Sequence, residues 1–236
     1  MNAVDREKTY LPLLSEVPMF AGLAPEVRRF VSGGCYQRSE ARGRVLCERG
    51  SPLDGFFCVL SGRVKLAILS EAGAERAVEI VLPSGSFGEA SALLEQPFPL
   101  HAEALSDLRL LVVSGARTRE AISRWPEIAL LVMERLSRRV NGLIRDLECC
   151  CLMPASRRVV EFLLREVDGR APATHGIEVE LPAAKAVVAS TLNLTAETFS
   201  RELHGLARDG LLVIDRRRIR VLSVEGLRKR CVGPAA

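Results

Sequence analysis

The chain has 236 residues, of which 48% are hydrophobic and 26% are charged, and its formal net charge is +4. Two modest domains with real cores are the natural expectation for this length. No apolar run approaches the roughly 18 residues that span a bilayer, and the polar start MNAVDREKTY does not resemble a signal peptide, so we expect a cytoplasmic protein without a membrane segment.

The excess positive charge lies in the C-terminal part of the chain. From Ala155 onward there are 14 Lys and Arg against 10 Asp and Glu, whereas the residues before it carry 19 of each. The basic residues cluster near the end, at Arg216, Arg217, Arg218, Arg220, Arg228, Lys229 and Arg230. Such a patch suits a phosphate backbone, although it could also be a solubilising surface.

The first elements in chain order are helical. The pattern from Leu11 to Gly33 predicts helices, with a further helix that begins at Ala24-Pro25-Glu26 and runs to Phe30. Their apolar contacts are expected from Leu13, Leu14, Val17, Phe20 and Leu23.

The sequence period changes between Cys35 and Ser114, where short β-prone runs alternate with glycine turns at Arg42-Gly43, Arg49-Gly50, Ser61-Gly62, Ala72-Gly73 and Ser84-Gly85. This pattern indicates an all-β barrel or sandwich. We expect Phe56–Leu60 and Val64–Leu69 to pair as a hairpin around Ser61-Gly62. The second strand should lead through residues 71–74 into a strand at Ala77–Leu82.

A long helix follows the short helix Gly115–Arg124 and the break at Trp125-Pro126, and it runs to Cys151. Its apolar residues are spaced 4, 3, 4, 3, 4, 3, at Ala129, Met133, Leu136, Val140, Leu143, Leu147 and Cys150. Such a heptad seam predicts pairing with the same helix of a second subunit. The alternative is a helix packed on its own barrel, and Ile128, Leu131 and Ile144 could face a barrel.

A joint at residues 152–155 separates the C-terminal domain, because Pro154 cannot continue the helix. We therefore divide the chain into residues 1–125, the dimerisation helix 126–152 and a C-terminal domain at 153–236. In that domain we expect a helix at Ser156–Glu166, a loop to His175 and a strand at Ile177–Leu181.

Two short helices and a hairpin come next. We expect the first helix at residues 183–192 and a turn at Asn193-Leu194. Thr195 should cap a second helix at 196–208, which Gly210 should end. Leu211–Ile214 and Arg218–Leu222 then pair around Asp215-Arg216-Arg217. This order is typical of a helix-turn-helix with a wing.

The second of these helices has two different faces. Phe199, Leu203 and Leu206 form an apolar stripe that packs inward. The other face carries Glu197, Ser200 and Arg201. Arginine can donate two hydrogen bonds to guanine, glutamate can accept a hydrogen bond from cytosine, and serine can bond to several bases. The alternative is a solvated face with pairing of Glu197 and Arg201. Candidate contacts to the DNA backbone are Thr195, Lys185, Arg216, Arg217 and Arg218.

The segment LTAETFSRELHGLARDGLL resembles the recognition segment of the cyclic-AMP receptor/fumarate-nitrate reductase regulator (Crp/Fnr) family, and its E-T-F-S-R core is specific. The stretches LLSEVPMFAGL and FFCVLSGRVKLAILSEAGAERAVEIVLPSGSFGEASAL are similar to the opening helix and the β-roll of that family. The likeness covers nearly the whole chain and is especially close to the dissimilatory nitrate respiration regulator branch. It implies an α+β fold with an N-terminal β-roll sensor domain, a long dimerisation helix and a C-terminal winged helix-turn-helix.

The resemblance also implies a function. A homodimeric, effector-controlled transcription regulator, and not an enzyme, would read a half-site like TTGAT in an inverted repeat through Glu197, Ser200 and Arg201. Its partners would be double-stranded DNA and RNA polymerase. The family commonly has a glycine in the wing turn, which Asp215-Arg216-Arg217 lacks, so the turn type stays open.

The resemblance suggests effectors that these residues do not all support. The cyclic-nucleotide motif Phe87-Gly88-Glu89 is present, but Pro99, Leu100 and His101 stand at the positions that match the phosphate-binding Arg-Ser or Arg-Thr of the family. A buried cyclic phosphate without a countercharge is costly, so we do not expect cyclic AMP. The cysteines at 35, 47 and 58 lack the close spacing of iron–sulfur ligands, so we do not expect a cluster either.

The nearest branch implies nitric oxide sensing through haem, which makes haem a candidate cofactor. Haem needs an axial ligand, and His101 is the histidine of the sensor domain, although it could equally be an ordinary barrel histidine. Thr191 stands where the branch has a histidine. The candidate effector pocket is Phe87, Gly88, Glu89 and His101. The sequence predicts no metal site.

Seven cysteines follow no regular spacing, so we expect a reduced protein in which most thiols are free. Cys149, Cys150 and Cys151 point in three directions around a helix, which is compatible with a thiol redox switch or with small packing residues. A haem- or thiol-dependent redox protein without DNA-binding activity is the alternative function. No set of nucleophile, base and orienting residue supports an enzyme.

Overall fold

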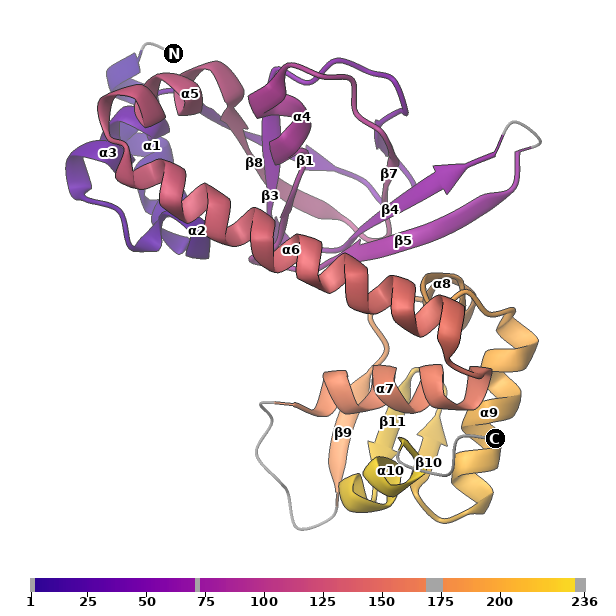
Figure 1. Ribbon diagram of the computed structural model, residues 1–236. Helices are drawn as coiled ribbons and strands as arrows, with labels where there is room; N and C mark the ends of the chain where they lie inside the picture. Colours follow the sequence, from indigo (N-terminus) through magenta and orange to yellow (C-terminus); the bar gives the residue numbers. More distant parts are fainter. Residues whose placement is uncertain (1–2, 71–72, 169–175, 232–236) are drawn as a thin grey trace. The chain divides into compact units, whose positions relative to one another are not determined.

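The computed structural model in Figure 1 describes residues 3–70, 73–168 and 176–231, and its elements form two units, Met1–Asn141 and Gly142–Ala236. The expected α+β class, with a β-rich N-terminal part, a long helix and a C-terminal helix-turn-helix, is confirmed. The expected loop to His175 and the turn at 71–74 lie wholly or partly outside the described residues. In that described part, no helix is both long and apolar enough to cross a bilayer.

The first unit contains two four-stranded antiparallel sheets and the helices that cover one of them. Its elements are α1 (Ala3–Glu16), α2 (Pro18–Ala21), α3 (Pro25–Ser32), β1 (Cys35–Glu40), β2 (Val45–Cys47), β3 (Gly55–Ser61), β4 (Val64–Leu69), β5 (Glu75–Val81), β6 (Ser86–Phe87), α4 (Glu89–Leu94), β7 (His101–Ala104), β8 (Leu108–Ser114), α5 (Gly115–Arg124) and the start of α6 (Glu127–Leu152). The strand orders are β1-β8-β3-β6 and β2-β7-β4-β5. We call the two facing sheets the β-roll.

Strands β3 and β8 of the sheet β1-β8-β3-β6 are largely buried on both faces, which explains their apolar runs, whereas β1 at the edge is mostly exposed or half-buried. On β3, Phe56 and Cys58 join a core with helices α1 to α3, α5 and α6, whereas Phe57 and Val59 join the core between the two sheets. Successive strand residues point to opposite faces, so a strand covered on both sides must be apolar throughout. The expected opening helices are confirmed, although α1 begins at Ala3 rather than Leu11.

The hairpin expected between β3 and β4 is wrong. β3 pairs with β6 and β8, and β4 pairs with β5 and β7, so Ser61-Gly62 carries the chain from one sheet to the other. Gly62 has a φ of 90°, and a Cβ there would lie 2.3 Å from the carbonyl oxygen of Asp107. This glycine is therefore required by a close crossing between sheets and not by a hairpin turn. The strand expected at Ala77–Leu82 is confirmed as β5, the hairpin partner of β4.

Helix α6 packs its first half against the first unit. Ile128 is buried and Leu131 partly buried there, as expected for residues that face a barrel, whereas Ile144 is exposed. Two ion pairs add to this packing, because Arg135 lies 3.3 Å from Glu89 and Arg139 donates two hydrogen bonds to Glu79, one of them at 2.8 Å. The division between the two units falls inside α6, after residue 141.

The second unit is a winged helix-turn-helix. Its elements after α6 are α7 (Ala155–Val167), β9 (Ile177–Glu180), α8 (Lys185–Thr191), α9 (Ala196–Arg208), β10 (Leu212–Asp215), β11 (Arg218–Val221) and α10 (Val224–Cys231), with strand order β10-β11-β9. Each element expected here is present within a few residues of its predicted bounds. The sequence analysis did not predict α10, whose single buried residue, Leu227, lies on a helix that contacts α7.

Candidate nucleic-acid interface

Local hydrogen bonds determine the turn between α8 and α9. Asn193 adopts a left-handed conformation with a φ of 55°, and the N–H of Leu194 donates to the carbonyl of Ala189 at 2.9 Å. Thr195 then caps α9, since its hydroxyl accepts the N–H of Thr198 at 3.1 Å. Asparagine tolerates the left-handed region and threonine is a favoured cap, so the sequence sets this turn locally.

The apolar stripe of α9 packs inward, as predicted. Phe199 and Leu203 are fully buried and Leu206 nearly so, and the ring of Phe199 meets the edge of the Phe162 ring from α7 with centroids 6.3 Å apart. Burial of this stripe leaves the opposite face of α9 directed to solvent. The rotation of α9 about its own axis is therefore fixed by three apolar side chains.

The outward face carries the three proposed base-reading residues. Glu197 and Arg201 are exposed and Ser200 is half-buried. The guanidinium of Arg201 lies 3.6 Å from Glu202, and no pairing with Glu197 occurs among the described contacts. An exposed pair of this kind contributes only about 0–1 kcal/mol, so a guanine could displace it. His204 stands one turn further along, where its Nδ1 lies 2.7 Å from the carbonyl oxygen of Ser200.

The three arginines of the wing turn have different surroundings. Arg216 adopts a φ of 52° between the paired residues Asp215 and Arg218. The wing turn, whose type the sequence left open, is therefore a tight connection with a non-glycine residue in the left-handed region. Arg217 donates from Nη2 to the carbonyl of Leu181 at 2.8 Å, and Arg218 lies 3.5 Å from Glu178. Arg217 therefore ties the wing to the segment before α8, whereas Arg216 is exposed at the tip. Lys185, the first residue of α8, is half-buried.

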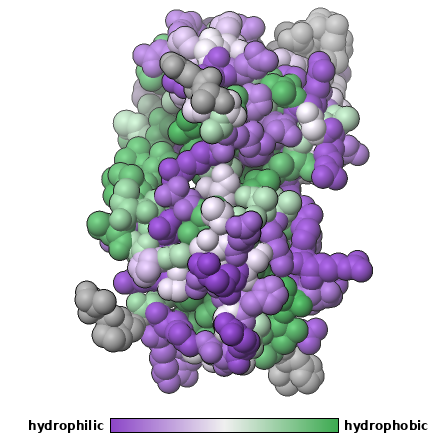
Figure 2. All heavy atoms as spheres, turned by 90° about the vertical axis from the view of Figure 1, so that its right-hand side faces the viewer, coloured by the Kyte–Doolittle hydropathy of each residue, from purple (hydrophilic) through white to green (hydrophobic). Residues whose placement is uncertain are grey.

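The proposed dimer seam of α6 is largely exposed in the single chain. Met133, Val140, Leu143 and Leu147 are 45 to 63% exposed, whereas Leu136 and Cys150 are partly buried. Figure 2 shows apolar surface gathered at the left of the view. This is the side that faces the viewer in Figure 1, where α6 lies in front. Monomeric proteins rarely expose a contiguous apolar stripe of this kind, which is typical of an interaction surface.

The four candidate effector residues have different surroundings within the described part of the first unit. Phe87 is buried in the core of the β-roll, where its ring stacks on Phe57 with centroids 4.9 Å apart, and Gly88 precedes α4 with a φ of 87°. Glu89 is 8% exposed and binds Ser86 and Arg135. His101 lies in the other sheet, opposite Ala67. Glu89 also lines a small cavity of about 10 Å³ beside α6. Its carboxylate already has protein partners in Ser86 and Arg135.

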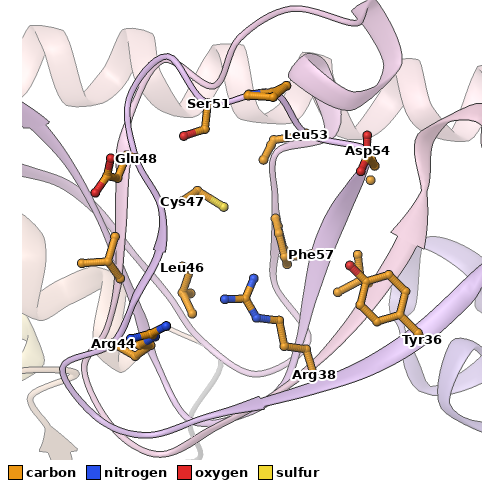
Figure 3. A pocket seen from close by; sticks show the side chains of 14 residues that line it. Tyr36, Arg38, Arg44, Leu46, Cys47, Glu48, Ser51, Leu53, Asp54 and Phe57 are labelled. Carbon is orange, nitrogen blue, oxygen red and sulfur yellow. The ribbon is translucent and has the colours of Figure 1, made fainter.

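A larger cavity of about 480 Å³ opens between β1, β2 and the start of β3 (Figure 3). Its lining combines an apolar floor with charged side chains, and includes Arg38, Arg44, Leu46, Cys47, Glu48, Leu53, Asp54 and Phe57. Arg38 donates from Nε to Glu40 at 2.5 Å, and its terminal nitrogens point toward Leu46 and Phe57 in Figure 3. The sequence analysis missed this site, because its residues carry no shared motif and are brought together only by the roll.

Burial keeps most of the cysteines of the first unit protonated. Burial raises the pKa of Cys47 to about 11 despite the opposing charge of Arg38, and that of Cys35 to about 12 despite Arg117. At the end of α6, Cys149 is buried and its pKa is raised by burial, Cys150 is partly buried and Cys151 is exposed. The three consecutive thiols therefore occupy three different environments.

Comparisons with known proteins match both units. A cyclic nucleotide-binding domain matches residues 37–124, and a Crp-like helix-turn-helix domain matches residues 157–230. The chain is 30% identical to the cyclic AMP receptor protein of Thermus thermophilus over 196 residues, 83% of this chain and 88% of that protein. It is 27% identical to the global nitrogen regulator of Synechocystis sp. over 183 residues, 76% and 81% of the two.

A solved structure shares the fold. FixK2 from Bradyrhizobium japonicum superposes with a TM-score of 0.75 at 22% identity, and the match covers 86% of this chain and 98% of that one. The similarity extends over both units and the helix between them.

Proposed function

The chain belongs to the Crp/Fnr family of transcription regulators, and on this premise we propose that it works as a homodimer that reads a TTGAT-like inverted repeat. The observation that carries the proposal is the outward face of α9, where Glu197, Ser200 and Arg201 lie at the capped N-terminal end of the helix. The N-terminal residues of a recognition helix are those that reach base edges in the major groove.

Each side chain has its own role in this proposal. Arg201 donates two hydrogen bonds to O6 and N7 of guanine, and Glu197 accepts from the N4 amino group of cytosine. Ser200 supplies an adaptable hydroxyl. Thr195, Lys185 and the wing arginines, with Arg216 at the tip, contact phosphates in this proposal. The phosphate contacts set the register, and the base contacts supply the specificity.

The apolar seam of α6 supports the homodimer. Two reading helices must lie about 34–36 Å apart to enter successive major grooves on one side of DNA, and a two-fold pairing of α6 is a simple way to present them in duplicate. The expected domain division at 125/126 and 152/153 remains a proposal on the same grounds, as does contact with RNA polymerase. A DNA-binding role also places the protein in the cytoplasm.

For the first unit we propose control by a small molecule and not by cyclic AMP. The space near Glu89 is filled by the pair with Arg135, and Pro99 and Leu100 offer no countercharge to a cyclic phosphate. The cavity of Figure 3 has the size of a small-molecule site. The Nε of Arg38 donates to Glu40, but its terminal nitrogens point into the cavity and suit a carboxylate.

The cavity lining favours a carboxylate over haem, although it includes Tyr36, a residue type that can ligate haem iron. His101 is not among its lining residues, and the buried thiol of Cys47, with its pKa raised to about 11 by burial, is a poor source of the thiolate that ligates iron. A carboxylate effector and a haem make different predictions. An absorption spectrum with an iron assay of the purified protein tests the haem, and a Soret band with stoichiometric iron would overturn this part of the proposal.

The test of DNA reading is fluorescence anisotropy with a duplex that contains the inverted TTGAT repeat, compared with a scrambled duplex of equal composition. We expect preference for the repeat by at least about a thousandfold at physiological salt. Light scattering on the same samples gives the oligomeric state. Equal affinity for both duplexes would refute sequence-specific reading.

A further inference from the structure

Arg158 makes hydrogen bonds to two separate parts of the second unit. Its Nε donates to the carbonyl of Met153 at 2.9 Å, just beyond the end of α6. Its Nη1 donates to the carbonyls of Leu192 and Asn193, both at 3.0 Å, in the turn between α8 and α9. One guanidinium thus bridges the joint that follows the dimer helix and the turn that precedes the reading helix.

The acceptors explain why an arginine stands here. The last carbonyls of a helix have no partner within the helix and carry the negative end of its dipole. Leu192 and Asn193 directly follow α8, and Met153 directly follows α6, so Arg158 places one positive charge beside the C-terminal ends of two helices. A lysine has the charge but not the planar fork that reaches acceptors on both sides.

The surroundings make this bridge stiff. Arg158 stands in the first turn of α7, where its own N–H donates to the carbonyl of Pro154 at 3.1 Å, and the next two residues, Val159 and Val160, are buried in the core. The short helix of the turn is packed by the buried residues Val188 and Leu192. The guanidinium is therefore held from one side by the core of α7 and from the other by the turn.

We propose that Arg158 is a positioning residue that holds the reading helix at a fixed angle to the end of the dimer helix, and so determines which spacing of half-sites the dimer accepts. The inference rests on the proposed function, because spacing has meaning only for a dimer that reads an inverted repeat. Arg158 acts through the turn at Asn193 and touches no base.

The experiment measures spacing selectivity with the full-length protein. Inverted TTGAT repeats with the optimal spacer, and with one base pair more or fewer, are titrated with wild type, Arg158→Met and Arg158→Lys. Arg157→Met is the matched control, because Arg157 precedes it on the same helix and is exposed. Wild type and control are expected to prefer the optimal spacer. The loss of charge-assisted hydrogen bonds of this kind changes an equilibrium constant by a factor of about ten or more. The affinity ratio between the optimal spacer and the other spacers should therefore fall by about that factor in Arg158→Met.

A merely structural role would give a different result. It would weaken binding to all spacers alike and leave their ratio unchanged, and that outcome overturns the inference. Thermal unfolding shows whether Arg158→Met folds. If it does not, the same ratio of affinities for the three spacers is measured with Arg158→Lys, which retains the charge. The salt dependence of binding should stay at the wild-type slope, because Arg158 neutralises no phosphate. If wild type itself shows no preference for the repeat, it is the proposed function that fails.

Discussion

Arginines of α5 and α6 in the first unit and arginines at the tips of α9 and the wing in the second have different surroundings. In the first unit, Arg135 and Arg139 of α6 and Arg119 of α5 pair with acidic side chains of the same unit, Glu89, Glu79 and Glu95. In the second, Arg201 and Arg216 are exposed, and the residues from 155 onward hold the whole excess of positive charge. One residue type therefore fastens a helix in one unit and remains available to a partner in the other.

The comparison shows that charge count alone does not locate a binding surface. The residues before 155 contain more basic side chains than those after it, yet acids balance them in number. What distinguishes the second unit is a rigid apolar scaffold, with Phe199 and Leu203 fully buried, that presents basic side chains outward. The predictions below test whether the distinction between inward pairing and outward presentation holds.

The largest effect is expected at the seam of α6. Leu143→Glu places like charges face to face in the proposed dimer, which costs about 3 kcal/mol or more and should yield monomers. Asn141→Glu, on the same helix but off the seam and exposed, should remain dimeric. Light scattering over a range of concentrations measures both. A Leu143→Glu protein as dimeric as wild type would show that the seam is misassigned.

Base discrimination should depend on Arg201. Arg201→Met is expected to lose about 1–3 kcal/mol of preference for the guanine in each half-site, because the bidentate contact is absent. Arg208→Met, at the other end of α9 and also exposed, is the control and should keep that preference. Anisotropy with duplexes in which the guanine is replaced provides the measurement. Undiminished discrimination by Arg201→Met would remove this residue from the reading role.

The buried thiols predict an alkaline weakness of the first unit. Burial raises the pKa of Cys58 above that of an unfolded thiol, near 9, so only the unfolded state loses this proton as the pH rises past 9. Stability is therefore intact below pH 9 and falls above it, by about 1.4 kcal/mol per pH unit for each such thiol. Urea unfolding of wild type and Cys58→Ala between pH 8 and 10.5 should show a shallower decline in the variant. Cys151→Ser, at an exposed thiol, should decline as wild type does.

The smallest effect is expected at Arg216, where two variants distinguish backbone strain from the proposed phosphate contact. Arg216→Gly relieves a left-handed conformation and should stabilise the protein by up to about 1 kcal/mol, whereas Arg216→Ala should not. Both should lower the salt slope of DNA binding by about 1, because both remove one phosphate contact. Thermal unfolding and salt titrations measure the two effects. Unchanged salt slopes would mean that the wing tip does not touch DNA.

The second unit was predictable from sequence because its signals are local. Thr195 caps α9, Asn193 takes the left-handed turn and Gly210, with a φ of 71°, ends the helix, each within a few residues of the element it defines. The outward position of Arg201 follows from the spacing of the apolar stripe alone. Helix α10 was missed because it contributes one buried residue, Leu227, too few for a periodic pattern.

The first unit was predictable only as a class of fold. Its glycine turns indicated short strands, but the partner of each strand depends on contacts between residues far apart in the chain. Gly62 illustrates this, since the same dipeptide suits a hairpin or a crossing, and only the approach of the Asp107 carbonyl decides between them. The cavity at Arg38 arises in the same way, from β1, β2 and β3 together.

By itself, the sequence determined most of the helices, the helix-turn-helix, the heptad spacing of α6 and the face of α9 that carries Arg201, because capping and periodicity act over a few residues. Only the tertiary structure decided how the strands pair, that Glu89 is occupied by Arg135 and that Arg158 bridges Met153 and Asn193. The side-chain contacts span 5 to 46 positions in the chain, and the strand pairs reach as far as Cys35 with Val113. All of them depend on where the core places each element.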